Sequence, residues 1–167
     1  VMIADSGLVT VVGGKWTTYR KMAQDTVDNV AMVAGLRERP CVTESLPLYG
    51  WTDEPSAEES DSLDVYGSSK HRVAAFLESQ PGLSQQIHDR LPYALGLVSW
   101  AVQHEMARTV EDVLARRTRS LLLDARASVE AAPSVATFMA GALHKDKSWA
   151  EDQVRAFDSL AQAYIVD

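Results

Sequence analysis

Hydrophobic positions form a strand-like run only near the start of the sequence and follow a helical spacing almost everywhere else. The run Leu8–Val12 is apolar and largely β-branched, which predicts a strand. After Gly13 and Gly14 the spacing becomes helical, and Gly35 is well placed to follow the last turn of a helix. The apolar positions of this helix are Tyr19, Met22, Ala23, Val27, Val30 and either Val33 or Ala34. The pattern therefore predicts a strand, a tight turn and a helix.

The segment from Leu36 to about Glu59 interrupts this periodicity. It holds three prolines and no sustained hydrophobic repeat, and both features are typical of a linker. We therefore expect two units, with a boundary near residue 45. Residues 1–44 would form the strand, turn and helix, and residues 45–167 an all-helical domain.

Signals at helix ends place the first helices of the second unit. A short helix is expected over Ser69–Ser79, where Pro81 and Gly82 close it. A longer helix is expected over Pro92–Met106, because proline is favoured in a first turn. Both segments carry an apolar side at helical spacing, so both are expected to pack on a core.

Two further helices are expected in the middle of this unit. Thr109 and Asp112 resemble a capping box and predict a helix that carries apolar residues as far as Leu121. The pattern over Asp124–Leu143 predicts another helix, which Pro133 must kink unless a new helix begins there.

The last helix has the clearest start in the sequence. Ser148 and Glu151 form a capping box ahead of an apolar stripe. The stripe consists of Val154, Phe157, Leu160, Ala161 and Tyr164. We expect all these helices to share one core. The predicted fold class is therefore mainly α, a helical domain preceded by one strand, turn and helix.

Composition removes several classes of function. The chain has 167 residues, 46% of them hydrophobic, but no apolar segment long enough to cross a bilayer. Its net charge of -7 argues against a nucleic-acid partner, because nonspecific affinity for nucleic acid comes from neutralising phosphates. Cys41 is the only cysteine, so neither an internal disulfide nor a thiolate zinc cluster is expected.

The opening residues, VMIADSGLVTVV, have the pattern expected in the middle of a sheet and not at its beginning. A lone strand leaves its backbone donors and acceptors unpaired. We therefore expect the neighbours of Leu8–Val12 to lie in upstream sequence or in another molecule, and we interpret the chain as a fragment.

The turn between strand and helix is the main candidate site. Gly13 and Gly14 leave backbone N–H groups and the positive end of a helix dipole accessible, which favours an anion or an electron-rich ring edge. Lys15 adds a full charge. A nucleoside triphosphate loop is excluded, because Trp16 and Val9 occupy the positions where it needs a hydroxyl residue and a glycine. From the residues alone, a simple tight turn with Lys15 facing water stays open.

Three stretches of the sequence resemble one known family. GGKWTTYRKMAQDTVD closely resembles the late segment of the FAD-dependent glycerol-3-phosphate dehydrogenases of aerobic bacterial and mitochondrial type. The stretch Trp100–Ser128 resembles the signature of that family's helical C-terminal domain, and EAAPSVATFMAGAL resembles the helix that follows it. The resemblance covers nearly the whole chain.

The resemblance implies an N-terminal FAD domain of glutathione-reductase type, with this chain as the C-terminal portion of the enzyme. Residues 1–44 would end the FAD-binding domain, and residues 45–167 would form a helical cap. The family's GxGxxG fingerprint and substrate arginines are absent from this sequence, so the chain alone is expected to be inactive. The implied reaction passes a hydride from C2 of glycerol 3-phosphate to flavin N5, with electrons then going to a quinone.

The implied partners are the upstream FAD domain, glycerol 3-phosphate, a quinone and a membrane surface. In the family the enzyme is peripheral, at the cytoplasmic membrane or the mitochondrial inner membrane. No nucleic-acid partner and no metal are implied.

By the same resemblance, the turn lies against the pyrimidine side of the flavin ring. The implied cofactor-binding residues are Gly13, Gly14, Lys15, Trp16 and Thr17. Negative charge develops at flavin N1 and O2 when a hydride arrives at N5, so backbone donors and a helix N-terminus aimed there would stabilise it. Lys15 is implied as a catalytic and substrate-binding residue, which either strengthens that field or pairs with the substrate phosphate.

The remaining arginines are assigned structural roles. For Arg20, an ion pair on the surface is at least as well supported as a substrate contact. Arg116, Arg117 and Arg119 form a basic cluster, for which a solvated or interdomain salt network is preferred over contact with phosphate or membrane headgroups.

Histidines and tryptophans are interpreted in the same way. His104 and Glu105 are neighbours on a helix and point about 100° apart, so a structural role is preferred over acid–base chemistry. The other histidines, which lack metal-ligand spacing, are His71, His88 and His144. The tryptophans beside apolar stripes, which are expected in the core, are Trp16, Trp100 and Trp149.

Three alternatives remain at this stage. Glycerol-3-phosphate oxidase shares the flavin chemistry but passes electrons to oxygen. A noncatalytic helical interaction module would account for the missing fingerprint. A helix-turn-helix DNA binder built on EMARTVEDVLARRTR would account for the basic residues, although the acidic net charge opposes it.

Overall fold

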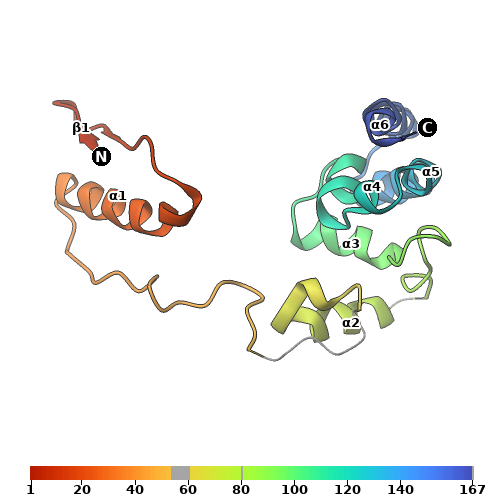
Figure 1. The fold of residues 1–167 in the computed structure, drawn as a ribbon, viewed down its shortest axis with the longest axis horizontal. Helices are drawn as coiled ribbons and strands as arrows, with labels where there is room; N and C mark the ends of the chain where they lie inside the picture. Colours follow the sequence, from red (N-terminus) through yellow and green to blue (C-terminus); the bar gives the residue numbers. More distant parts are fainter. Residues whose placement is uncertain (54–60, 80, 167) are drawn as a thin grey trace. The chain divides into compact units, whose positions relative to one another are not determined.

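The computed structural model describes residues 1–53, 61–79 and 81–166 (Figure 1). The chain divides into two compact units, Val1–Trp51 and Thr52–Asp167. Helices account for most of the regular structure, and the strands described are one short pair. The predicted mainly α fold is therefore confirmed.

The first unit begins with a two-stranded antiparallel ladder. The strand expected over Leu8–Val12 is reduced to Val9–Thr10 (β2), which pairs with Met2–Ile3 (β1). Gly7, at φ 83°, donates its N–H to the carbonyl of Ala4 at 2.8 Å and reverses the chain between the two strands. The expectation that this strand has no neighbour within the chain is therefore wrong. Two residues are too short a run to be recognised as a strand in the sequence.

The helix that follows agrees with the periodicity. A 3₁₀ turn, Trp16–Thr18 (η1), leads into the α-helix Tyr19–Val33 (α1). Gly35 adopts φ 62° just beyond its end, and the N–H of Leu36 donates to the carbonyl of Ala31 at 2.9 Å. This bonding satisfies carbonyls that the helix end would otherwise leave unpaired.

The predicted linker contains neither helix nor strand over residues 36–53. Its remaining part, residues 54–59, lies outside the described residues. The division between the two units falls between Trp51 and Thr52, within the predicted linker.

The second unit opens with a 3₁₀ helix, Asp64–Ser69 (η2), followed by the α-helix Lys70–Glu78 (α2). Ser69 and Ser79 cap α2, in agreement with the helix predicted between them.

The next helix, Leu95–His104 (α3), is shorter than predicted. Its expected start at Pro92 is wrong, because Ala94 forms an antiparallel bridge with Gln86 and is held in an extended conformation. The expected end at Met106 is also wrong, because Met106 takes a left-handed backbone at φ 59°.

The helix expected to run from Thr109 to Leu121 is broken in two. A π-helix, Asp112–Arg117 (η3), and a short α-helix, Ser120–Leu123 (α4), are separated by Arg119 at φ 57°. The buried Thr118 hydroxyl donates to the carbonyl of Val113 at 2.9 Å and lies 2.7 Å from Ser120 Oγ. This local bonding ends the first helix and starts the second.

The helix Ala125–Ala142 (α5) begins where the sequence predicts. Asp124 is its N-cap and accepts a hydrogen bond from the N–H of Ala127 at 2.8 Å. Pro133 lies inside this helix, and no new helix begins there.

The helix Lys147–Ala161 (α6) has a different cap from the one predicted. Asp146 accepts from the N–H of Trp149 at 2.9 Å, so the box predicted at Ser148 and Glu151 is wrong. The helix starts two residues earlier than predicted, so Ser148 lies within its first turn instead of at the cap position. A 3₁₀ turn, Gln162–Tyr164 (η4), follows α6.

The helical unit has two hydrophobic clusters instead of the single core expected. The larger one is built from α3, η3, α4, α5 and α6, with Leu114, Met139 and Phe157 among its fully buried side chains. The smaller one consists of Val73, Leu97 and Trp100. Tyr93 is half-buried and packs against both clusters.

Candidate functional site

An open hollow of about 590 Å³ lies where the glycine turn meets the first turns of α1. Its lining residues are Val11, Gly13, Gly14, Lys15, Trp16, Tyr19, Met22, Ala23, Thr26 and Val27. Four of the five residues predicted for the cofactor site, all but Thr17, therefore surround one cavity.

The two positions of the turn require glycine for different structural reasons. Gly14 has φ 92°, and a Cβ atom built there would overlap the Met22 thioether. Gly13 has φ 83°, but a Cβ atom there would meet no other atom within 4 Å. Gly14 therefore allows close packing of the turn on α1, whereas Gly13 supplies only a backbone conformation that other residues rarely adopt.

The start of the helix exposes backbone donors. The N–H of Lys15 donates to Thr18 Oγ1 at 3.0 Å, and the N–H of Thr18 donates to the carbonyl of Lys15 at 2.9 Å. Within the described residues, the N–H groups of Trp16 and Thr17 make no hydrogen bond. Two donors and the positive end of the α1 dipole are thus available to an electron-rich group.

Lys15 and Trp16 are both exposed beside these donors. No hydrogen bond or ion pair of the Lys15 ammonium is found in the described part of the chain. Trp16 is 85% exposed and stacks on Tyr19 with ring centroids 5.2 Å apart. The expectation that Trp16 is a core residue is therefore wrong.

Arg20 lies on α1 but binds neutral partners. Its Nη1 donates to Gln24 Oε1 at 3.1 Å and to Thr43 Oγ1 at 3.4 Å. The surface ion pair considered for it is not formed with any described residue. The Thr43 hydroxyl also lies 3.0 Å from Cys41 Sγ, and this hydrogen bond lowers the pKa of the exposed thiol.

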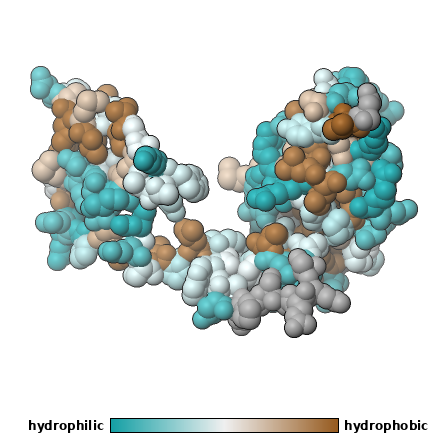
Figure 2. All heavy atoms as spheres, in the orientation of Figure 1, coloured by the Kyte–Doolittle hydropathy of each residue, from teal (hydrophilic) through white to brown (hydrophobic). Residues whose placement is uncertain are grey.

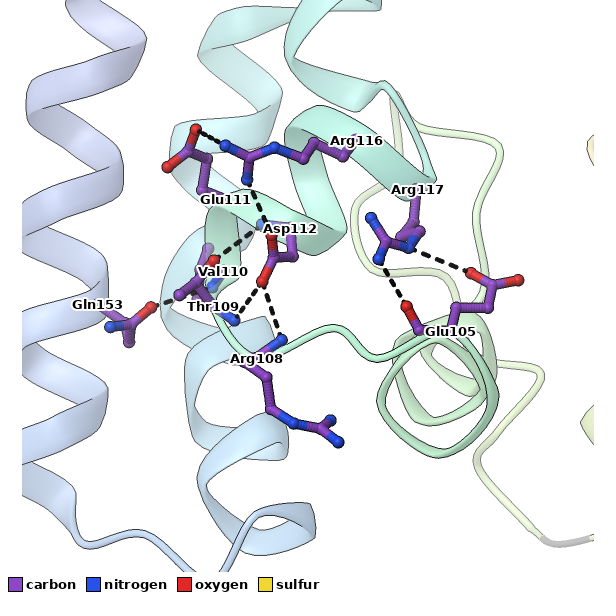
Figure 3. Close-up of polar contacts among 9 residues, drawn as sticks. All are labelled: Glu105, Arg108, Thr109, Val110, Glu111, Asp112, Arg116, Arg117 and Gln153. Atoms are coloured by element: carbon purple, nitrogen blue, oxygen red, sulfur yellow. Dashed lines mark hydrogen bonds and ion pairs between the residues drawn. The ribbon is translucent and has the colours of Figure 1, made fainter. Parts of the chain in front are cut away.

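The capping box predicted at Thr109 and Asp112 is present (Figure 3). The Asp112 carboxylate accepts from the N–H groups of Arg108 and Thr109, and the N–H of Asp112 donates to Thr109 Oγ1 at 3.0 Å. Burial alone would raise the pKa of Asp112, but these bonds and the nearby Arg116 guanidinium together hold it below its ordinary value.

The basic cluster is largely tied down within the helical unit (Figure 3). Arg116 pairs with Glu111 at 2.5 Å and with Asp112 at 2.9 Å. Arg117 donates to the backbone carbonyl of Glu105 at 2.6 Å, and its Nε lies 3.7 Å from Glu105 Oε2. A salt network is therefore present for two of the three arginines, and all its partners lie within the helical unit instead of in another domain.

His104 and Glu105 have structural surroundings, as interpreted from the sequence. The indole N–H of the buried Trp100 donates to Glu105 Oε1 at 3.1 Å, and the His104 ring lies 4.1 Å from the Trp100 ring. Burial raises the pKa of Glu105, while the bond from Trp100 and the charge of Arg117 oppose this shift. Trp149, by contrast with Trp16, packs on the larger cluster.

The described residues contain neither a metal-binding cluster nor a membrane-spanning helix. No group of three or more His, Cys, Asp and Glu side chains is placed to hold a metal ion. His88, for example, has its Nε2 2.8 Å from Glu130 Oε2. No helix among them is long and apolar enough to cross a membrane.

The hollow also includes residues that sequence reasoning missed. Tyr19, Met22 and Val27 were recognised only as one apolar side of the helix. Their position on the first turns of the helix, close to the glycine pair, is the feature of the sequence that indicates a place in the same cavity. The side chains of α1 that face the glycine turn therefore line the cavity together with the turn itself.

Comparison with known proteins gives a consistent relationship. Residues 8–150 match the family described as the C-terminal domain of alpha-glycerophosphate oxidase. A probable mitochondrial glycerol-3-phosphate dehydrogenase of Caenorhabditis elegans is 35% identical over 99% of this chain and 25% of its own length. The mitochondrial enzyme of Mesocricetus auratus is 32% identical over 99% of this chain and 24% of its own length. The Arabidopsis thaliana enzyme is 31% identical over 95% of this chain and 30% of its own length.

The chain thus spans about a quarter of the length of the curated relatives it matches. No solved structure matches it. On the match over residues 8–150, the chain belongs to the family of the C-terminal domain of alpha-glycerophosphate oxidase.

Proposed function

We propose that this chain is the C-terminal portion of an FAD-dependent glycerol-3-phosphate dehydrogenase, which oxidises glycerol 3-phosphate to dihydroxyacetone phosphate. The family and the names of the relatives support this reaction. The observation that carries the proposal is the hollow at the start of α1, because it gathers Gly13, Gly14, Lys15 and Trp16 around one cavity.

The residues of the hollow fit an electron-rich ring edge such as that of a flavin. The N–H groups of Trp16 and Thr17 have no partner in the described chain, and the open space beside Gly13 leaves room for a ring. A helix N-terminus contributes about 0.3–1 kcal/mol to a nearby negative charge when exposed, and up to about 2 kcal/mol when partly buried. When bound, the flavin supplies hydride acceptance at N5.

The protein's own contribution at this site is binding, orientation and electrostatics. Gly13 and Gly14 shape the turn, and the N–H groups of Trp16 and Thr17 would donate to an electron-rich edge of the bound cofactor. Lys15 is the proposed catalytic and substrate-binding residue. Its ammonium either stabilises the charge that develops at that edge or binds the substrate phosphate.

The helical unit is proposed to act as a noncatalytic cap. Its polar clusters bind its own helices together, as the Glu105–Arg117 and Asp112–Arg116 pairs do. The dinucleotide fingerprint and the substrate arginines of the family are absent from this sequence, so residues 1–167 alone are proposed to be inactive.

Electrons are proposed to pass from the flavin to a quinone. The enzyme is proposed to be peripheral, at the mitochondrial inner membrane or at the cytoplasmic membrane of a bacterium. The mitochondrial relatives support the first location.

One alternative acceptor has support of its own. The matched family is described as a domain of an oxidase, which passes electrons to oxygen. Hydrogen peroxide formed in step with glycerol 3-phosphate consumption would favour the oxidase, whereas quinone-dependent turnover without peroxide would favour the dehydrogenase.

The test is the flavin absorption band of the complete gene product before and after anaerobic addition of glycerol 3-phosphate. We expect the band to bleach in the parent and to bleach slowly or not at all in Lys15→Met. A rise in KM alone would assign Lys15 to phosphate binding, and a fall in kcat alone would assign it to the developing charge. A protein without flavin, or a band that does not respond to substrate, would refute the proposal and favour a helical interaction module.

A further inference from the structure

The short helix α4 exposes apolar side chains in a unit that buries most of its own. Leu122 is 66% exposed and Leu123 is 62% exposed, whereas Ser120 and Leu121 on the same helix are buried. One turn of helix therefore turns one side to the core and presents two adjacent leucines to the surface.

Arg119 stands immediately before these leucines with an unfavourable backbone. Its φ of 57° is a conformation that glycine adopts at little cost and other residues rarely adopt. Thr118 and Ser120 on either side are buried, and their hydroxyl oxygens lie 2.7 Å apart. The residues on both sides of Arg119 are thus buried, while the side chain of Arg119 lies at the surface.

Arg119 also differs from its basic neighbours. Arg116 and Arg117 are both engaged by carboxylates of the helical unit. The Arg119 guanidinium makes no hydrogen bond or ion pair with any residue that the structure describes. One exposed cation and two exposed leucines therefore adjoin each other.

We propose that Arg119, Leu122 and Leu123 form the surface by which the helical unit docks on the upstream FAD domain of the same polypeptide. The inference rests on the proposed function, because it assumes that domain. The facing surface would be apolar for the leucines and would carry a carboxylate for the guanidinium, since a bidentate carboxylate matches its planar donors.

The size of the surface favours a covalently linked partner. Stable complexes between separate proteins bury about 800 Å² per partner, far more than two leucines and one arginine offer. A linked domain needs less area, because the connection raises its effective concentration. The relatives extend over about four times the length of this chain, so such a domain is available in them.

A bilayer is a poorer match for the same surface. Helices that lie in a membrane interface have a long apolar face with several basic residues on the polar side. Helix α4 has four residues, and its flanking residue Arg119 supplies one unpaired cation among those described.

The test places the photo-crosslinking residue p-benzoylphenylalanine at position 123 of the complete gene product. We expect an intramolecular product between position 123 and a peptide that precedes Val1. The matched control carries the crosslinker at Val65, which is 82% exposed on η2, and is expected to give no such product. Position 122 repeats the test if the first variant fails to fold.

Combining the crosslinker with Arg119→Gly tests the role of the arginine side chain. Glycine suits the backbone at φ 57°, so this variant is expected to fold normally and to lower the crosslink yield severalfold. A product with a second copy, with lipid or with another part of the helical unit would overturn the proposal, and so would a yield no higher than that of the control.

The crosslinking result is read separately from the proposed function. Substrate-dependent bleaching of the flavin is measured on the same preparation. Bleaching without an upstream crosslink refutes the docking surface alone, whereas an upstream crosslink in a protein that does not respond to glycerol 3-phosphate refutes the function alone.

Discussion

The two units of the chain differ in how far they bury their hydrophobic residues. Among the described residues, every buried hydrophobic side chain lies in the helical unit, between Val73 and Ala161. In the first unit no residue is buried, and side chains such as Val27 and Leu8 are 64% and 65% exposed. Figure 2 shows apolar residues at the surface of the first unit. The helical unit thus completes its own cores, whereas the first unit owes its shape to local bonds.

This difference explains why the candidate site and the stable core lie in different parts of the chain. The glycine turn and helix start of the first unit are set by backbone conformations and short-range bonds. Its apolar surface needs a cover to contribute to stability, because burial is what makes such residues stabilising. The proposed FAD domain would supply that cover and complete the site.

The largest effect is expected for a core residue of the helical unit. Phe157 is 1% exposed, so Phe157→Ala removes a large buried side chain and leaves a cavity. We expect the free energy of unfolding of residues 1–167 to fall by about 3–5 kcal/mol. Val27→Ala, at an exposed apolar position, is expected to change it by less than about 0.5 kcal/mol. Urea denaturation measures both, and equal losses would contradict the contrast between the units.

A smaller effect, confined to the site, is expected for the glycine pair. In the complete gene product, Gly14→Ala combines an unfavourable backbone with displacement of the Met22 thioether and is expected to lose more of its flavin than Gly13→Ala does. Gly13→Ala bears only the backbone cost, roughly 1–2 kcal/mol, and is expected to keep more. The ratio of flavin to protein absorbance measures occupancy. Equal occupancy in the two variants would show that packing of the turn on α1 does not matter for the site.

Helix caps should have effects of intermediate size. Thr109→Ala and Asp146→Ala each remove a partner of the backbone at a helix start, and each is expected to cost about 0.5–2 kcal/mol. Ser148→Ala is the control and is expected to be nearly neutral, although the sequence alone favours it as the cap. Thermal unfolding of the three variants decides, and a loss at Ser148 as large as that at Asp146 would contradict the observed cap.

The smallest effect is a change in the pH dependence of stability. The pKa of Glu105 is raised by burial, so between its unfolded and folded pKa values the folded protein holds more protons. The free energy of unfolding should therefore fall as pH rises from about 4.5, the ordinary value, through the raised pKa. Glu105→Gln should lack this fall. Urea denaturation at several pH values measures the free energy of unfolding of parent and variant. Subtracting one from the other cancels the opposite pH dependence that Asp112 gives to both proteins.

A difference between parent and Glu105→Gln that grows in the parent's favour with rising pH would contradict this assignment. It would mean that the Arg117 pair outweighs the cost of burying the carboxylate. The variant keeps the hydrogen bond from the Trp100 indole, so the comparison concerns the charge alone.

The sequence predicted those elements whose ends are set by their own residues. Asp124 starts α5 through a hydrogen bond to its own side chain, and Gly35 ends α1 as expected. The capping box at Thr109 was predictable because both partners lie within one turn. The hollow was predictable in part, because a glycine pair directly before a helix indicates a tight turn beside an accessible helix start.

Other features depended on competition or on distant contacts and were not predictable. Asp146 and Ser148 are both residue types that cap helices, and only the structure shows that the helix starts after Asp146, whose carboxylate accepts from the N–H of Trp149. The bridge that Ala94 makes with Gln86 delays α3, and Arg119 breaks a helix that its residue type would continue. The exposure of Trp16 was missed, because an aromatic beside an apolar stripe is usually covered.

The most direct test of the contrast between the units is amide hydrogen exchange, measured on residues 1–167 alone and on the complete gene product. We predict slow exchange in α5 in both proteins, and slow exchange in α1 only in the complete one, where the proposed upstream domain would cover it. Equal protection of α1 in the two proteins would contradict the claim that the first unit depends on a cover outside this chain.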